Sequence, residues 1–162
     1  MDPPPTPRLT VGFALIKGDR PEVAVQALTE VGVDRIVPFI ADRTIVRWEG
    51  AKAARNAERL RRIARSAAIQ AHRSWVPEVG DLIRFDDLAA EPGVALAHPG
   101  GGELPAGTRT LLVGPEGGWS PREEAAVIGR VGLGPHVLRA ATAATVAGAV
   151  LVATRLPGTE RG

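Results

Sequence analysis

The chain alternates between short apolar runs and longer stretches whose apolar residues recur at helical spacing. The apolar runs predict strands over residues 9–16, 36–40, 94–97 and 110–113, with shorter strands at 44–48 and 137–138 and an extended segment over 75–79. The periodic stretches predict helices over 22–31, 51–73, 121–131 and 142–155. Because apolar strands alternate with helices, the pattern predicts an α/β domain over residues 9–156, with a mainly parallel sheet flanked by helices on both faces.

Local signals mark the ends of several elements. Gly32 follows the first predicted helix, where glycine commonly ends a helix in a left-handed conformation. Ser120 and Glu123 form a capping-box pattern at the start of helix 121–131. The proline-rich residues 1–8 predict a disordered leader or the remnant of a linker, and residues 157–162 predict a flexible tail.

Composition narrows the possible functions. The 162 residues suit one domain, include no cysteine, and contain no apolar run of the roughly 20 residues that span a membrane, so we expect a cytoplasmic protein without membrane contact. The three histidines lack metal-ligand spacing, and no metal site is expected. Residues 1–80 hold 13 Lys/Arg against 9 Asp/Glu, a balance of +4, whereas residues 81–162 hold 7 against 9. A polyanion contact is therefore expected in the N-terminal half.

Two glycine-containing loops follow apolar strands. The first reads Gly114-Pro115-Glu116-Gly117-Gly118-Trp119-Ser120, and the second reads Leu133-Gly134-Pro135-His136-Val137-Leu138-Arg139-Ala140-Ala141-Thr142-Ala143. Glycine lets the main chain approach a ligand closely, so the pair suits a nucleotide-like molecule, although the first loop could be an ordinary turn. The motifs of P-loop and dinucleotide-binding proteins are absent. We expect Trp119 to fill the core; the alternative is stacking on a base.

These two motifs, in this order, resemble the paired C-terminal motifs of the RsmE family of SPOUT-class methyltransferases. Segments 14–20, 29–38 and 67–79 resemble the family's first strand with its Lys-Gly turn, its "TELGV" segment and its Gln-Arg-Pro segment, so the resemblance covers about residues 10–155. Family members usually carry a further N-terminal RNA-binding domain. The chain is therefore expected to correspond to the catalytic domain alone.

The resemblance implies a C-terminal trefoil knot, S-adenosylmethionine as cofactor, a homodimer, and methylation of N3 of a uridine in the 16S rRNA of the small ribosomal subunit. Two alternatives stay open. One is a SPOUT methyltransferase that acts on another RNA site. The other is a cofactor- or RNA-binding module with impaired catalysis, because Ala140 and Ala141 stand where the family's second loop has polar residues.

The resemblance also implies roles for individual residues. Backbone groups of the two loops and of one strand end would hold the cofactor, at Ala97, His98, Val113, Gly114, Pro115, Glu116, Gly117, Gly118, Leu133, Val137, Leu138, Arg139, Ala140, Thr142 and Ala143. Arg139 would stabilise negative charge on the uracil oxygens or grip a phosphate; the alternative is an ion pair, with Glu116 as its candidate partner. Glu116 would act as a base or, as we expect, hold its loop by accepting backbone amides.

Basic residues of the N-terminal half would contact RNA. The candidates are Lys17, Arg20, Arg55, Arg59 and Arg62, together with Gln70 and Arg73, which lie one helical turn apart. The alternative is a solvated helix surface over residues 51–73, with Arg73 serving as a helix cap.

Overall fold

The computed structural model describes residues 2–17 and 20–156. In chain order the elements are β1 (Thr10–Ala14), α1 (Arg20–Val31), β2 (Arg35–Ile40), α2 (Ala51–Gln70), β3 (Glu78–Val79), β4 (Ile83–Arg84), α3 (Phe85–Ala89), β5 (Val94–Gly102), β6 (Thr110–Val113), α4 (Pro121–Ala126), β7 (Gly129–Val131), α5 (Ala140–Val152) and a final 3-10 turn, Ala153–Arg155. Within these ranges no helix combines the length and the apolar character that crossing a membrane would need.

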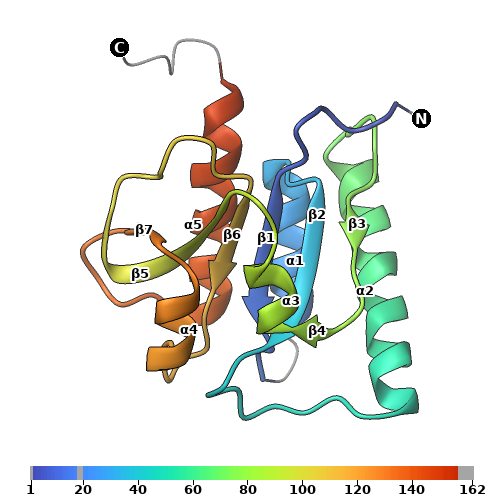
Figure 1. Ribbon diagram of the computed structural model, residues 1–162. Coiled ribbons are helices and arrows are strands. Elements are labelled where there is room, and N and C mark those ends of the chain that lie inside the picture. Colours follow the sequence, from blue (N-terminus) through green and yellow to red (C-terminus); the bar gives the residue numbers. More distant parts are fainter. Residues whose placement is uncertain (1, 18–19, 157–162) are drawn as a thin grey trace.

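The strands form one parallel sheet. Their order is β3-β2-β1-β6-β5-β7, and β4 also pairs with β2. β1 lies in the middle, with Val11 opposite Ile36 of β2 on one side and Leu111 of β6 on the other. Helices α1 and α5 lie behind the sheet and α3 and α4 in front of it (Figure 1). The predicted α/β class, with helices on both faces of a parallel sheet, is confirmed.

Successive residues of each central strand enter two different cores. In β6, Leu111 and Val113 pack with α1, α2 and α5, whereas Leu112 packs with α3 and the segment around α4. In β2, Ile36 faces the first core and Phe39 the second. Side chains alternate across a strand, so a strand buried on both faces must be apolar throughout, which is the pattern in the sequence.

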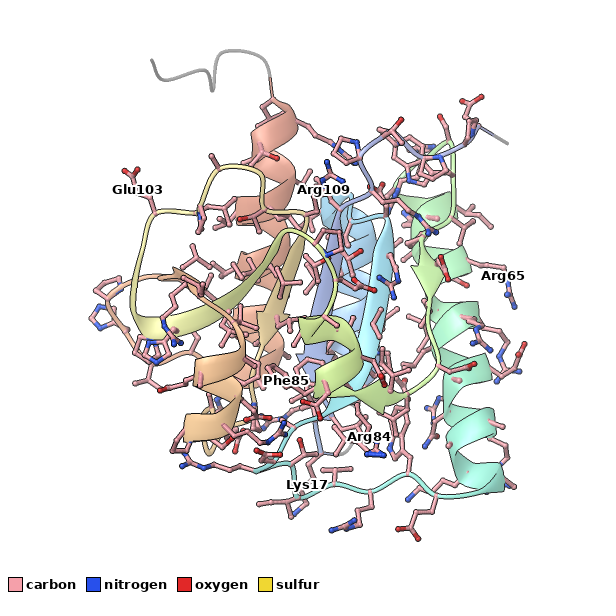
Figure 2. All side chains as sticks on the ribbon, viewed as in Figure 1. Lys17, Arg65, Arg84, Phe85, Glu103 and Arg109 are labelled. Carbon is pink, nitrogen blue, oxygen red and sulfur yellow. The ribbon has the colours of Figure 1, made fainter. Side chains whose placement is uncertain are left out.

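Helix α2 packs against α1 through a narrow apolar stripe. The predicted stripe is confirmed: Leu60, Ala64, Ala67 and Ala68 are buried, and Ile63 is partly buried against the same core. The basic residues of α2 lie outside this stripe, as Arg65 shows by pointing away from the sheet (Figure 2).

The strand predicted at 44–48 is wrong. After β2 the chain runs without regular structure to the start of α2 at Ala51. The apolar residues in this segment suggested a strand, but the free side of β2 is occupied by β3 and β4, which come later in the chain. A strand from 44–48 could therefore not pair with β2, the strand that it directly follows.

The helix predicted over 121–131 is confirmed at its start but wrong from residue 127 on, and the strand predicted at 137–138 is wrong. Helix α4 ends at Ala126, Val127 is extended, and Gly129–Val131 forms β7 on the edge of β5. Residues 137–138 lie in a loop with Val137 fully exposed. The open edge of β5 recruited the apolar residues 127–131, and this tertiary pairing outweighed their helical spacing.

Smaller differences concern element ends. The C-terminal helix is confirmed, but it begins two residues earlier than predicted and closes in a 3-10 turn, whereas α2 ends at Gln70 rather than at residue 73. Gly32 has a positive φ of 107°, which confirms the predicted helix end. Residues 2–8 form no helix or strand and contact the body through an ion pair between Arg8 and Glu78. The tail predicted at 157–162 lies outside the described residues.

Candidate cofactor and RNA site

The loops that follow the strands meet at one edge of the sheet. In a parallel sheet the carboxyl ends of neighbouring strands lie together, and ligands bind outside them. The segments after β1, β2, β6 and β7 begin at this edge, and Lys17, just after β1, lies there in Figure 2. The two predicted motifs are therefore brought to the same edge as the basic N-terminal turn.

Trp119 anchors the Gly114–Gly118 loop in the core. Its side chain is only 7% exposed and stacks on Phe39, with ring centroids 6.1 Å apart. Its indole N–H donates to the carbonyl of Ala97, at 2.8 Å, and so joins this loop to the end of β5. A Cβ at Gly114 would lie 2.9 Å from the indole ring, so only glycine fits there. The predicted core role of Trp119 is confirmed.

The main chain of both glycine-containing loops keeps unused donors. Within 114–118 the amide of Gly118 donates to Pro115 O, whereas in the described part of the chain the amides of Glu116 and Gly117 reach no protein acceptor. The amides of residues 133, 134 and 136–139 likewise have no acceptor among the described residues. Backbone N–H groups that the protein leaves available can bind the polar edges of a small ligand.

The other residues predicted to contact the cofactor differ in how far they are exposed. Val113 is buried at the end of β6, while Ala97, His98, Leu133, Leu138, Ala140 and Ala143 are half-buried and Val137, Arg139 and Thr142 are exposed. His98 Nε2 lies 2.8 Å from Glu124 Oε1, and His98 Nδ1 accepts from the amide of Gly100. This pair fixes the imidazole at the end of β5, with the proton on Nε2 when the ring is neutral.

Glu116 does not hold its loop. Its side chain is 75% exposed and forms an ion pair with Arg20 at 3.8 Å. The expectation that Glu116 accepts backbone amides is wrong, because its carboxylate points to solvent at the lip of the site. Arg139 directly precedes α5, and among the described residues it forms no ion pair, with Glu116 or with any other acid.

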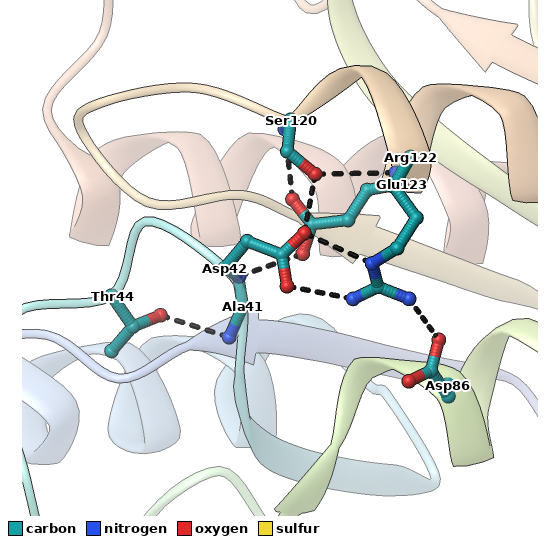
Figure 3. Close-up of polar contacts among 7 residues, drawn as sticks. All are labelled: Ala41, Asp42, Thr44, Asp86, Ser120, Arg122 and Glu123. Atoms are coloured by element: carbon teal, nitrogen blue, oxygen red, sulfur yellow. Dashed lines mark hydrogen bonds and ion pairs between the residues drawn. The ribbon is translucent and has the colours of Figure 1, made fainter.

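The carboxylate that does bind the loop amides belongs to Glu123 (Figure 3). It is completely buried, and its two oxygens accept from Ser120 N and Asp42 N, each at 2.9 Å. The amide of Glu123 donates in return to the Ser120 hydroxyl, so the predicted capping box is confirmed. The contact with Asp42, which lies 81 positions away, was not predicted.

Asp42 connects this cap to Arg122 and α3. Arg122 donates to both Asp42 oxygens, at 2.6 and 3.1 Å, and to Asp86 at 2.6 Å. The Ser120 hydroxyl donates to Asp42 at 2.5 Å. Hydrogen bonds from Arg122 and Ser120 lower the pKa of the Asp42 carboxyl below its ordinary value, and Asp42 and Asp86 raise the pKa of Arg122. Asp42 is therefore held ionised.

A basic cleft of about 700 Å³ opens beside the Gly114–Gly118 loop. Its lining combines the cations Lys17, Arg20, Arg43, Arg47 and Lys52 with Pro115, Glu116, Gly117 and Ala140 from the two motifs. Arg43 donates to the carbonyl of Gly117 at 3.0 Å and so bridges the two walls. The sequence analysis named Lys17 and Arg20 but missed Arg43 and Arg47; Arg47 lies in the segment 44–48 that was interpreted as a strand, and Arg43 directly precedes it.

Helix α2 carries the predicted basic surface. Arg55, Arg59, Arg62 and Gln70 are exposed, although Arg59 pairs with Glu22 at 2.8 Å. Arg59, Arg62 and Gln70 line one shallow groove between α1 and α2. The groove also holds the acids Glu22 and Glu30, so the basic character is strongest on the outer side of α2.

Arg73 is not part of that surface. Its side chain is 7% exposed and donates to the carbonyls of Thr29 and Val33, both at 2.9 Å. Burial lowers the pKa of its guanidinium, while the buried Asp34 acts in the opposite direction. The prediction that Arg73 reaches substrate together with Gln70 is wrong: the chain turns inward after α2, and Arg73 caps the end of α1 instead.

No cluster of metal ligands accompanies these sites. Within residues 2–17 and 20–156, no three His, Cys, Asp or Glu side chains gather in a way that could hold a metal ion. The available chemistry therefore comes from backbone amides, cationic side chains and two exposed groups, Glu116 and Arg139.

The sequence and the fold both match known RNA methyltransferases. The model of the family described as an RNA methyltransferase domain matches residues 3–152. The chain is 38% identical to ribosomal RNA small subunit methyltransferase E of Mycobacterium bovis, covering 94% of this chain and 66% of that protein, and 32% identical to the Bacillus subtilis protein of the same name, covering 84% and 62%. It thus spans just under two thirds of these relatives' length.

A solved structure agrees with this match. The small subunit methyltransferase E of Neisseria gonorrhoeae, bound to S-adenosyl methionine, superposes with a TM-score of 0.81 at 30% identity, covering 91% of this chain and 66% of that one. The matched residues include both motif loops and the basic N-terminal half. The chain therefore belongs to the RsmE family of SPOUT-type RNA methyltransferase domains.

Proposed function

We propose that this chain is the catalytic domain of an S-adenosylmethionine-dependent methyltransferase that modifies N3 of a uridine in 16S rRNA. The observation that carries the proposal is the meeting of a glycine-rich loop with unused amides and a five-cation cleft at one sheet edge. The unused amides of the loop suit a small polar cofactor, and the cationic cleft suits the phosphate chain of an RNA. Such a substrate implies a cytoplasmic reaction.

The cofactor would lie against the two loops. The amides of Glu116 and Gly117, together with those of residues 133, 134 and 136–139, would bind its polar edges, and Gly114 allows the main chain to sit close to the Trp119 ring. S-adenosylmethionine supplies an activated methyl group when bound, so the protein has only to orient the acceptor and assist loss of its proton.

Two exposed groups can act on the uracil ring. Arg139 lies where α5 begins, unpaired among the described residues, and would stabilise the negative charge that develops on the uracil oxygens. Glu116 lies at the lip of the basic cleft, 3.8 Å from Arg20, and would accept the N3 proton.

The RNA would enter through the basic cleft and extend over α2. Lys17, Arg20, Arg43, Arg47 and Lys52 would hold phosphates near the target nucleotide, with Arg55, Arg59, Arg62 and Gln70 contacting the strand further along. Arg73 is buried and is not part of this surface. The family resemblance adds a trefoil knot and a homodimer, and such an interface would cover Ile128 and Val137, which are fully exposed.

Transfer of a labelled methyl group tests the proposal. The protein is incubated with labelled S-adenosylmethionine and small ribosomal subunits that lack the modification, and the methylated nucleotide is mapped. We expect a single uridine labelled at N3. Label at another RNA would support a different SPOUT specificity, and cofactor binding without transfer would support the binding module with impaired catalysis.

Arg139→Ala tests the catalytic assignment in the same assay. Loss of one preorganised charge contact to a developing oxyanion costs roughly 100-fold in rate, and we expect a fall of that order with little change in cofactor affinity. The Arg84→Ala variant, whose side chain lies on β4, serves as the matched arginine control. An Arg139→Ala protein with an unchanged rate would contradict the role.

A further inference from the structure

The two walls of the site come from loops that are far apart in the sequence. The Gly114–Gly118 loop forms the cofactor side, and the segment 41–50 after β2 forms the outer wall of the basic cleft with Arg43 and Arg47. Methyl transfer needs the acceptor and the donor in one fixed relative position. A contact that holds these two loops together would therefore fix the relative position of donor and acceptor in the proposed reaction.

One completely buried carboxylate joins them directly. Glu123 accepts the amide of Asp42 with one oxygen and the amide of Ser120 with the other. Asp42 immediately precedes Arg43, and Ser120 immediately follows Trp119, so each amide lies at the root of one wall. A single side chain thus satisfies one backbone donor from each loop.

The surrounding contacts strengthen the connection. Arg122 and the Ser120 hydroxyl hold the Asp42 carboxylate, Phe39 stacks on Trp119, and Arg43 donates to Gly117 O. Of these contacts, the one between Arg43 and Gly117 lies in the lining of the cleft. Glu123 itself has no exposed surface, so it cannot touch cofactor or RNA.

We propose that Glu123 is a positioning residue whose buried carboxylate locks the segment 41–50 to the Gly114–Gly118 loop, so that the RNA-binding wall and the cofactor loop keep one relative placement. The inference rests on the proposed function for its consequence in catalysis. Its structural part, the lock itself, can be measured without any turnover.

Glu123→Gln is the sharpest change. The amide keeps the size of the side chain but turns one of the two acceptors into a donor, which must face a backbone N–H. We expect faster hydrogen exchange over residues 41–47 and, because small misplacements are costly, a roughly 10- to 100-fold lower kcat on unmodified small subunits. The affinity for S-adenosylmethionine, measured by calorimetry, should change little.

Val25→Ala is the matched control for a general loss of stability. Val25 is fully buried in α1, in the core on the opposite face of the sheet. It should lower Tm but leave exchange over 41–47 and kcat near wild type. If Glu123→Gln and Val25→Ala lower kcat equally at equal Tm, and 41–47 stays protected in both, the lock is refuted.

Two further variants keep the test decisive. Arg122→Gln removes the half-exposed part of the network and, should Glu123→Gln not fold, must reproduce its effects in weaker form; no effect would overturn the inference. Combining Glu123→Gln with Arg43→Ala should give less than additive losses of kcat, because both act through one loop. If wild type binds cofactor but transfers nothing, the proposed function fails, and the exchange data alone decide on the lock.

Discussion

At the scale of single residues, buried side chains limit which residues fit in the loops of the site. Trp119 fills the space behind Gly114, so the loop has no room for a Cβ, and the indole also ties the loop to Ala97 of β5. Burying an aromatic ring under a ligand-binding loop makes the loop rigid before the ligand arrives. The cofactor affinity and the stability of the fold therefore depend on the same contact.

Gly114→Ala should destabilise the protein by about 1–3 kcal/mol, because the new methyl group would meet a ring that is stacked on Phe39 and cannot move aside. Gly102→Ala is the control: a Cβ there meets nothing within 4 Å, and its effect should stay within about 0.5 kcal/mol. Denaturant unfolding measures both. Equal losses would mean that the packing around Gly114 is looser than described.

At the scale of elements, α2 has one face that packs on α1 and another that we propose binds RNA. Its apolar stripe faces α1, and its arginines point outward. Just past its end the chain turns inward and buries Arg73 against Asp34 and Trp75. Arg62 and Arg73 were both predicted on the helix 51–73, but Arg62 is exposed whereas Arg73 is buried.

Exchanging each of these arginines for alanine should separate the two roles. Arg62→Ala should weaken RNA binding and reduce the salt dependence of affinity by about one counterion, with an unchanged Tm. Arg73→Ala should leave the salt dependence unchanged and cost about 1–3 kcal/mol, because the carbonyls of Thr29 and Val33 lose their buried donor. Asp34 keeps its ion pair with Arg155. RNA titrations at two or more salt concentrations, together with thermal unfolding, measure both. If the Arg73→Ala protein folds but binds RNA much more weakly, Arg73 contacts RNA, as the sequence analysis predicted.

At the scale of the whole molecule, the parallel sheet holds two cores apart and brings four loops to one edge. The contact of Glu123, Asp42 and Arg122 spans that edge from β2 to α4, with α3 attached through Asp86. Stability and site geometry are therefore coupled through charged groups. The coupling has a pH dependence whose sign follows from Asp42.

The pKa of Asp42 is lower in the folded protein than its ordinary value of 3.8. A lowered folded pKa contributes stability that is present above the unfolded value and is lost as pH falls through the folded one. We expect Asp42→Asn to be less stable than wild type near neutral pH, with the difference shrinking below about pH 4. The free energies of unfolding of both proteins, measured across pH, test this prediction. If the difference persisted at low pH, it would come from altered packing or hydrogen bonding of the asparagine and not from the lost carboxylate charge.

Local patterns were sufficient for the elements and for the identity of the two motif loops. Apolar strands separated by amphipathic helices predicted the parallel sheet, and the Ser120–Glu123 spacing predicted the cap, because both depend on neighbours within a few positions. Errors fell at 44–48, 127–131 and 137–138. In these segments a short apolar run forms a strand only if the edge of a neighbouring strand is free to pair with it. Which edges are free depends on the tertiary structure and cannot be read from a local pattern.

The chemistry of the site divides in the same way. From the residues alone came the glycine-rich loop that we propose holds the cofactor, the role of Trp119 in the core and the basic N-terminal half. Only the tertiary structure decided that Glu123, and not Glu116, holds the loop, that Arg43 and Arg47 face the cleft, and that Arg73 is buried. A backbone pattern is set by adjacent residues, whereas the partner of a polar side chain is whichever distant group the fold brings within hydrogen-bonding reach.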